Sequence, residues 1–64
     1  MVNLYRVGSV IEYHSFGSEY ARRVVVESKE TDVKNGRPGF DGLLVDGTLA
    51  VWGYDDQISR VITY

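Results

Sequence analysis

The chain has 64 residues, a formal net charge of −2 and no cysteine. It therefore has room for one small domain, residues 1–64, and no disulfide or thiolate metal site. Hydrophobic residues make up 44% and charged residues 25%, which excludes a disordered tail. The longest apolar run, residues 49–52, is too short to span a membrane. The absence of cysteine and of a membrane-spanning run in the sequence leads us to expect a cytoplasmic protein.

The residue types favour β-strands along the whole chain. Ten Val, three Ile, three Thr and eight aromatic residues prefer extended backbone, while good helix formers are scarce. Seven Gly and one Pro interrupt the chain at short intervals, as tight turns do in antiparallel sheets. The composition therefore predicts an all-β domain.

The first two strands are predicted at residues 8–13 and 21–27, with a break at 16–18. The second strand carries three adjacent valines, at positions 24–26. A helix there would lose side-chain freedom at three β-branched residues and gain no apolar stripe. Both faces of a strand at this point must meet apolar neighbours, which predicts a strongly bent strand.

Residues 31–42 contain three glycines and the only proline, and we expect them to form the main loop of the domain. A hairpin that turns tightly at Asn35-Gly36 is the alternative. If residues 31–42 form a loop, it either presents Arg37 and Phe40 for recognition of a partner or serves only as a spacer.

The clearest local pattern is Asp46-Gly47 between two β-rich runs, residues 42–45 and 48–52. This pair is typical of a two-residue type I′ hairpin, because both central residues need a positive φ. Residues 55–58 then predict one 3₁₀ turn that begins at an Asp pair. A last strand is predicted at 59–63.

This order resembles the SH3-like small barrel shared by SH3, Tudor, KOW and chromo-barrel modules. The resemblance is carried by strands at 8–13, 21–27, 42–45, 48–52 and 59–63, with a short turn at 55–58. It implies a five-stranded antiparallel barrel that binds partners through aromatic loops. A short, cysteine-free chain of this kind also resembles the small accessory proteins that bacteriophages encode.

No set of residues in the sequence predicts catalysis, a metal site or a cofactor. His14 is the only histidine, and Glu12 beside it on the same strand face is typical of a solvated pair. Asp55-Asp56 opens a turn, where carboxylates cap backbone N–H groups without a metal. The glycines at 36 and 39 lack the Lys-Ser/Thr and the helix of a phosphate-binding loop. We expect a non-enzymatic protein.

The aromatic residues are the most informative feature for function. A core of this size holds three or four of the eight rings, because each buries roughly 150–250 Å². Alternation along the strand puts Trp52 and Tyr54 on one face, which is partly exposed if the aliphatic face is inward. The alternative for Trp52 is that it closes one end of the barrel.

The sequence therefore predicts a protein-interaction module that binds a partner protein through an aromatic and arginine-bearing patch. The predicted partner-binding residues are Phe16, Tyr20, Arg37, Phe40, Trp52 and Tyr54. One alternative is single-stranded nucleic acid stacked on these rings, with arginines on the backbone, although the negative net charge disfavours it. The other is a homo-oligomer that buries a leftover apolar face.

Overall fold

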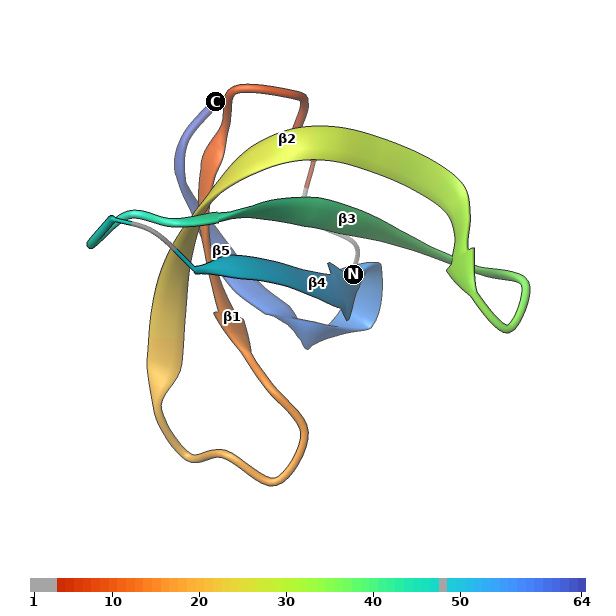
Figure 1. The fold of residues 1–64 in the computed structure, drawn as a ribbon, viewed down its shortest axis with the longest axis horizontal. Coiled ribbons are helices and arrows are strands. Elements are labelled where there is room, and N and C mark those ends of the chain that lie inside the picture. Colours follow the sequence, from red (N-terminus) through yellow and green to blue (C-terminus); the bar gives the residue numbers. More distant parts are fainter. Residues whose placement is uncertain (1–3, 48) are drawn as a thin grey trace.

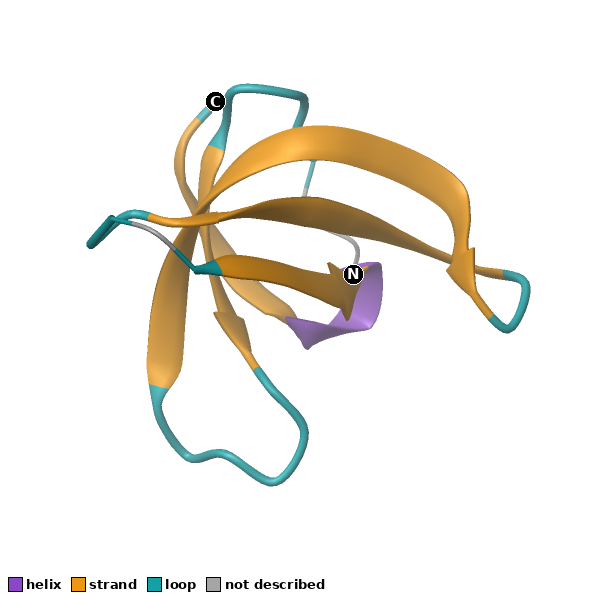
Figure 2. Cartoon of the chain, viewed as in Figure 1, coloured by secondary structure: helices purple, strands orange, loops and turns teal. Residues whose placement is uncertain are grey.

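The computed structural model describes residues 4–47 and 49–64. It contains five strands and one 3₁₀ helix: β1 (Val10–His14), β2 (Ala21–Lys34), β3 (Arg37–Leu44), β4 (Ala50–Tyr54), η1 (Asp55–Gln57) and β5 (Ile58–Thr63). The strands form one antiparallel sheet in the order β4-β3-β2-β1-β5 (Figure 1). Figure 2 shows loops between the first four strands and the 3₁₀ helix between β4 and β5. The all-β prediction is confirmed. No described helix has the length and apolar character needed to cross a membrane.

Strand β2 is the longest strand and is shared by two parts of the sheet. It pairs with β1 from Ala21 to Val25 and with β3 from Val24 onward. A register irregularity lies between Val26 and Ser28, and the ribbon of β2 curves over the other strands (Figure 1). Val24 and Val26 are buried while Val25 lies on the opposite face. The strand bends, as predicted, but Val25 is 37% exposed, so its outer face is not covered as the sequence suggested.

The segment predicted as the main loop is a tight hairpin instead. Strand β2 continues to Lys34 and β3 begins at Arg37. Between them, Asn35 and Gly36 have φ angles of 57° and 72°, the two positive values that a type I′ turn requires. The long loop is therefore wrong and the tight turn is confirmed. Pro38 fits into β3 because the ladder to β2 is irregular between Glu30 and Lys34.

The second predicted hairpin forms between β3 and β4, but with a different turn. The Gly47 N–H donates to the carbonyl of Leu44 at 3.0 Å, so Asp46 is the third residue of a β-turn over 44–47. Asn35 is the only described non-glycine residue with a positive φ, so Asp46 lacks the conformation that type I′ needs. The two-residue type I′ prediction is wrong, and Thr48, predicted to begin the next strand, lies outside the described residues.

The 3₁₀ helix η1 follows β4, as predicted, and its last residue links two strands that do not pair. The Gln57 side chain accepts a hydrogen bond from the Tyr54 N–H and donates one to the carbonyl of His14, both at 2.8 Å. Within the described residues, β4 and β1 are not neighbours in the sheet, and β4 and β5 form its two edges without a ladder between them. The Gln57 amide therefore connects the end of β4 to the end of β1.

The core is built around Phe40, which is fully buried together with Ile11, Val24 and Val26. The rings of Tyr5 and Tyr13 lie edge-on to the Phe40 ring, at centroid distances of 6.2 and 5.4 Å. Four of the eight rings are buried, within the number predicted from the size of the core: Tyr5, Tyr13, Phe40 and Tyr54. The other four are exposed: Phe16, Tyr20, Trp52 and Tyr64.

Candidate functional site

Two exposed rings are held by one buried ring, and we call these three residues, Phe16, Trp52 and Tyr54, the aromatic platform. Tyr54 is 5% exposed, whereas Phe16 is 72% and Trp52 41% exposed. The Tyr54 ring packs edge-to-face with Phe16 at 5.8 Å and with Trp52 at 5.4 Å. The β1–β2 loop and strand β4, which are far apart in sequence, therefore present apolar area side by side.

The β2–β3 turn fixes Tyr54 from a third direction. The Asn35 side-chain amide donates to the Tyr54 hydroxyl at 3.1 Å. The guanidinium carbon of Arg37 lies 4.0 Å from the centre of the Tyr54 ring, a cation–π contact. Because the type I′ turn places Asn35 and Arg37 beside the end of β4, the ring is held by packing, by a hydrogen bond and by a cation.

Two cations of the turn flank the aromatic platform. Lys34 and Arg37 are cross-strand partners, and the Lys34 ammonium lies 5.2 Å from the centre of the Trp52 ring. Arg37 also forms an ion pair with Asp56 in η1, so its charge is balanced by a carboxylate of this chain. Sequence reasoning missed Lys34 because its segment was assigned to a loop. The Asn35-Gly36 pair was the signal that could have found it.

The Asp pair of η1 contacts side chains of other segments, Tyr5 and Arg37, and the predicted capping of backbone N–H groups by these carboxylates is not found within the described residues. Asp55 accepts a hydrogen bond from the buried Tyr5 hydroxyl, which also lies 3.1 Å from the carbonyl of Gly39. Burial raises the pKa of Tyr5, and the Asp55 carboxylate raises it further. A cavity of about 140 Å³ lies beside the pair, lined by Arg37, Pro38, Tyr54, Asp55 and Asp56. No group of three or more His, Asp or Glu among residues 4–47 and 49–64 could hold a metal ion.

Phe40 does not belong to this site, although the sequence placed it among the partner-binding residues. Its side chain is 0% exposed and packs between Tyr5 and Tyr13 in the core. The assignment is wrong because Phe40 lies in β3 and not in a loop. Tyr20 is 78% exposed in the same loop as Phe16, but it has no ring contact with the aromatic platform among the described residues.

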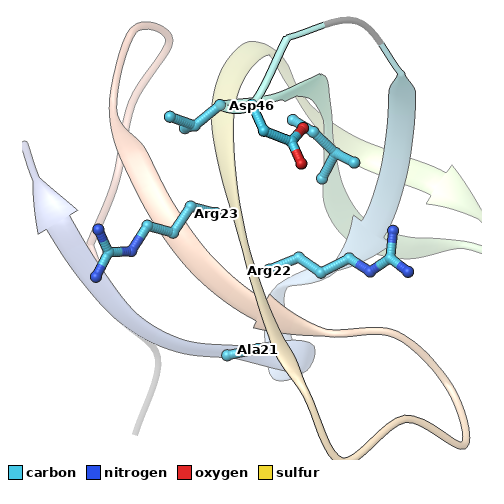
Figure 3. A pocket seen from close by; sticks show the side chains of 6 residues that line it. Ala21, Arg22, Arg23 and Asp46 are labelled. Carbon is cyan, nitrogen blue, oxygen red and sulfur yellow. The ribbon is translucent and has the colours of Figure 1, made fainter.

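A larger cavity, of about 460 Å³, lies on another part of the molecule where β2 and β3 diverge. It is lined by Ala21, Arg22, Arg23, Leu44, Val45 and Asp46. Figure 3 shows the Arg22 and Arg23 side chains pointing in opposite directions, as expected for successive residues of a strand. The two guanidinium groups therefore do not converge on one ligand position.

Arg23 and Arg60 share one carboxylate on the outer face of the sheet. Glu12 of β1 accepts hydrogen bonds from Arg23 at 3.1 Å and from Arg60 at 2.8 Å. The bonds to Arg60 and Arg23 lower the pKa of Glu12 below its ordinary value. Together with the pair between Arg37 and Asp56, three of the five arginines are ion-paired within the chain, through two carboxylates.

These contacts predict an acid-dependent contribution to stability. Because the pKa of Glu12 is lower in the folded chain, its stabilising effect is present above pH 4.5, the ordinary value, and is lost as pH falls through the folded value. We expect Glu12→Gln to lower the melting temperature slightly at pH 7 and to leave it unchanged at the lowest pH, where Glu12 is protonated. Thermal unfolding followed by circular dichroism, at pH values from 7 down to below the folded-state pKa of Glu12, measures the difference in melting temperature.

The control is Glu19→Gln, because Glu19 is exposed and has no ion pair within the described residues. We expect its melting temperature to follow that of the wild type at every pH. An equal loss of stability at low and neutral pH for Glu12→Gln would show that the carboxylate charge is not what stabilises the fold.

Comparison with models of protein families, with curated proteins and with solved structures finds no match for this chain. Its function is therefore inferred from its own residues.

Proposed function

We propose that this chain is a non-catalytic protein-interaction module with an SH3-like barrel, and that it binds a partner protein through the aromatic platform and Arg37. The strand order and the 3₁₀ turn before the last strand support the barrel. The link that Gln57 makes between β4 and β1 also supports it. The observation that carries the binding proposal is the pair of exposed rings, Phe16 and Trp52, held against buried Tyr54.

Rigid, exposed aromatic rings are suited to binding a protein. Trp, Tyr and Arg dominate the residues whose truncation weakens protein interfaces most. Ordering a free side chain at an interface costs about 0.5–1.5 kcal/mol. The Trp52 ring is already restrained by Tyr54 and by the Lys34 ammonium, which reduces this cost. Tyr20, exposed in the same loop as Phe16, extends the proposed contact.

The charges favour a protein over a nucleic acid as the partner. Phosphate binding draws its affinity from cations that release counterions. Arg37 next to the aromatic platform is paired with Asp56, and the chain as a whole carries a net charge of −2. A peptide surface with apolar side chains uses the exposed rings without needing an excess of positive charge.

The test compares the full chain and its Phe16→Ala and Trp52→Ala variants as bait in the native host extract, with quantitative mass spectrometry. The captured protein is then purified and titrated by calorimetry. We expect each variant to weaken its binding at least about tenfold, or about 1.4 kcal/mol. Thermal unfolding of each variant checks that the fold persists.

The matched control is Tyr64→Ala, because Tyr64 is also an exposed ring, at 62%, and lies outside the aromatic platform. We expect it to bind the partner as the wild type does. Equal binding by Phe16→Ala, Trp52→Ala and the wild type would overturn the proposal. So would a single-stranded oligonucleotide that binds at low salt and loses its affinity in the same two variants.

A further inference from the structure

Strand β4 is one edge of the sheet and has β3 on one side only (Figure 1). The Leu44 N–H donates to the carbonyl of Leu49 at 3.0 Å. In an antiparallel ladder, residues whose backbone groups point toward the neighbouring strand alternate with residues whose groups point away from it. Val51 and Gly53 therefore direct their backbone groups toward β3. Ala50 and Trp52 direct their N–H and C=O groups away from the sheet.

The open edge of β4 is short and has no charge to protect it. The next residue with outward backbone groups is Tyr54, but its N–H already donates to the Gln57 side chain. None of the five residues of β4 is charged, and none is a proline. Natural proteins usually protect an edge with one of these. The opposite edge, β5, carries Arg60.

We propose that β4 pairs antiparallel with β4 of a second copy of this chain, about a twofold axis at Val51. In this register, Ala50 of each copy exchanges both backbone hydrogen bonds with Trp52 of the other. A register centred on Trp52 would instead bring Ala50 opposite Tyr54, whose N–H is taken. Of these two registers, the available backbone groups therefore favour the one centred on Val51.

The side chains of β4 are self-complementary in this register. Each Trp52 ring lies beside the small Ala50 of the other copy, and the two Val51 side chains face each other as a β-branched pair. No like charges meet along the strand, although each chain carries a net charge of −2. These features favour a second copy as the occupant of the edge.

An apolar row continues from this edge across the outer face of the sheet. Val10 pairs with Val25, Val25 with Leu43, and Leu43 with Ala50. Directly paired residues share one face of a sheet, so the Trp52 ring of the second copy lies at the end of this row. A standard interface takes about 800 Å² from each partner, about a fifth of the 4295 Å² surface here. The row therefore has to contribute area beyond the strand.

The test measures association directly and at the proposed contact. Sedimentation velocity from about 1 µM to about 1 mM covers the affinities of small interfaces, and we expect the wild type to shift from monomer to dimer. Trp52 is the only tryptophan, so its fluorescence reports on the edge. Its emission should move to shorter wavelength and its quenching by iodide should fall over the same concentration range.

Two variants act on the edge without removing a bond to β3. Ala50→Lys places a charge on β4, and Ala50→Pro removes an N–H that points away from the sheet. We expect both to stay monomeric at every concentration, with Trp52 equally accessible throughout. The matched control is Ser59→Lys on β5, which adds the same charge to the other edge strand and should dimerise as the wild type does.

The proposal is overturned if the wild type stays monomeric at the highest concentration, or if Ala50→Lys and folded Ala50→Pro dimerise as the wild type does. It is also overturned if Ser59→Lys abolishes association equally. The result is separate from the binding of a partner protein. Phe16→Ala tests that binding and leaves the edge of β4 intact, whereas Ala50→Lys tests the edge and leaves the three rings of the aromatic platform in place.

Discussion

Replacing Phe40 with alanine is expected to lower the free energy of unfolding by about 3–5 kcal/mol. The ring is 0% exposed and packs edge-on to Tyr5 and Tyr13, so its removal leaves a cavity that these rings cannot close. A domain of this length has only about 3–10 kcal/mol of stability in total. We therefore expect Phe40→Ala to lose about a third or more of its stability at 25 °C, as measured by urea unfolding followed by circular dichroism.

The matched control for Phe40→Ala is Phe16→Ala, the same substitution at a ring that is 72% exposed. We expect it to cost less than about 1 kcal/mol, as surface substitutions do, and to lower the melting temperature by only a few degrees. If both variants lost the same stability, Phe16 would belong to the core, and the aromatic platform could not act independently of the fold. A Phe40→Ala variant as stable as the wild type would contradict the position of Phe40 at the centre of the core.

The second large effect is expected for Gly42→Ala in strand β3. Gly42 is buried opposite Val26, and a Cβ there would collide with the carbonyl oxygen of Val25 and a methyl group of Val24. Alanine gains about 0.5–1 kcal/mol from lower backbone entropy. The collision with the neighbouring strand costs more, so we expect a net loss of about 3 kcal/mol in urea unfolding.

Gly47→Ala in the β3–β4 turn is the control for Gly42→Ala. Gly47 has a φ of 139°, but an added Cβ would have no neighbour within 4 Å. We expect a loss of only about 1 kcal/mol from the strained backbone. If Gly42→Ala matched the wild type in stability, β2 and β3 would have to be farther apart at this position than the structure has them.

The two turn motifs illustrate where local sequence is insufficient. Asn35-Gly36 and Asp46-Gly47 are both sequences that favour a type I′ turn, but only the first adopts it, with positive φ at both residues. Near the first pair, three glycines and a proline suggested a loop. The glycines at 39 and 42 are needed because neighbouring strands leave no space for a Cβ. Glycines that allow a close approach between strands were therefore interpreted as the sign of a loop.

The candidate site was predictable only in part, because its contacts also depend on the β2–β3 turn. Phe16 and Trp52 are exposed, as predicted from an interior that holds only three or four rings, whereas Tyr54, predicted on the same exposed face as Trp52, is buried. Phe40 could not be separated from them, since the long loop put it on the surface. Lys34 and Arg37 reach the rings only because the tight turn brings them beside the end of β4. Arg37 was predicted as a binding residue, but its contact with the Tyr54 ring and the position of Lys34 beside Trp52 depend on this turn.

The sequence by itself determined the class of the fold, the bend of the second strand and the 3₁₀ turn before the last strand. The first two depend on β-branched side chains, and the turn on the hydrogen bond between the Tyr54 N–H and the Gln57 side chain three residues later. Only the tertiary structure decided which rings are buried and which are exposed. The burial of Tyr54 illustrates this, because it depends on Phe16, Asn35 and Arg37, which come from two other segments of the chain. Burial is a property of contacts between distant segments, and no local pattern of residues encodes those contacts.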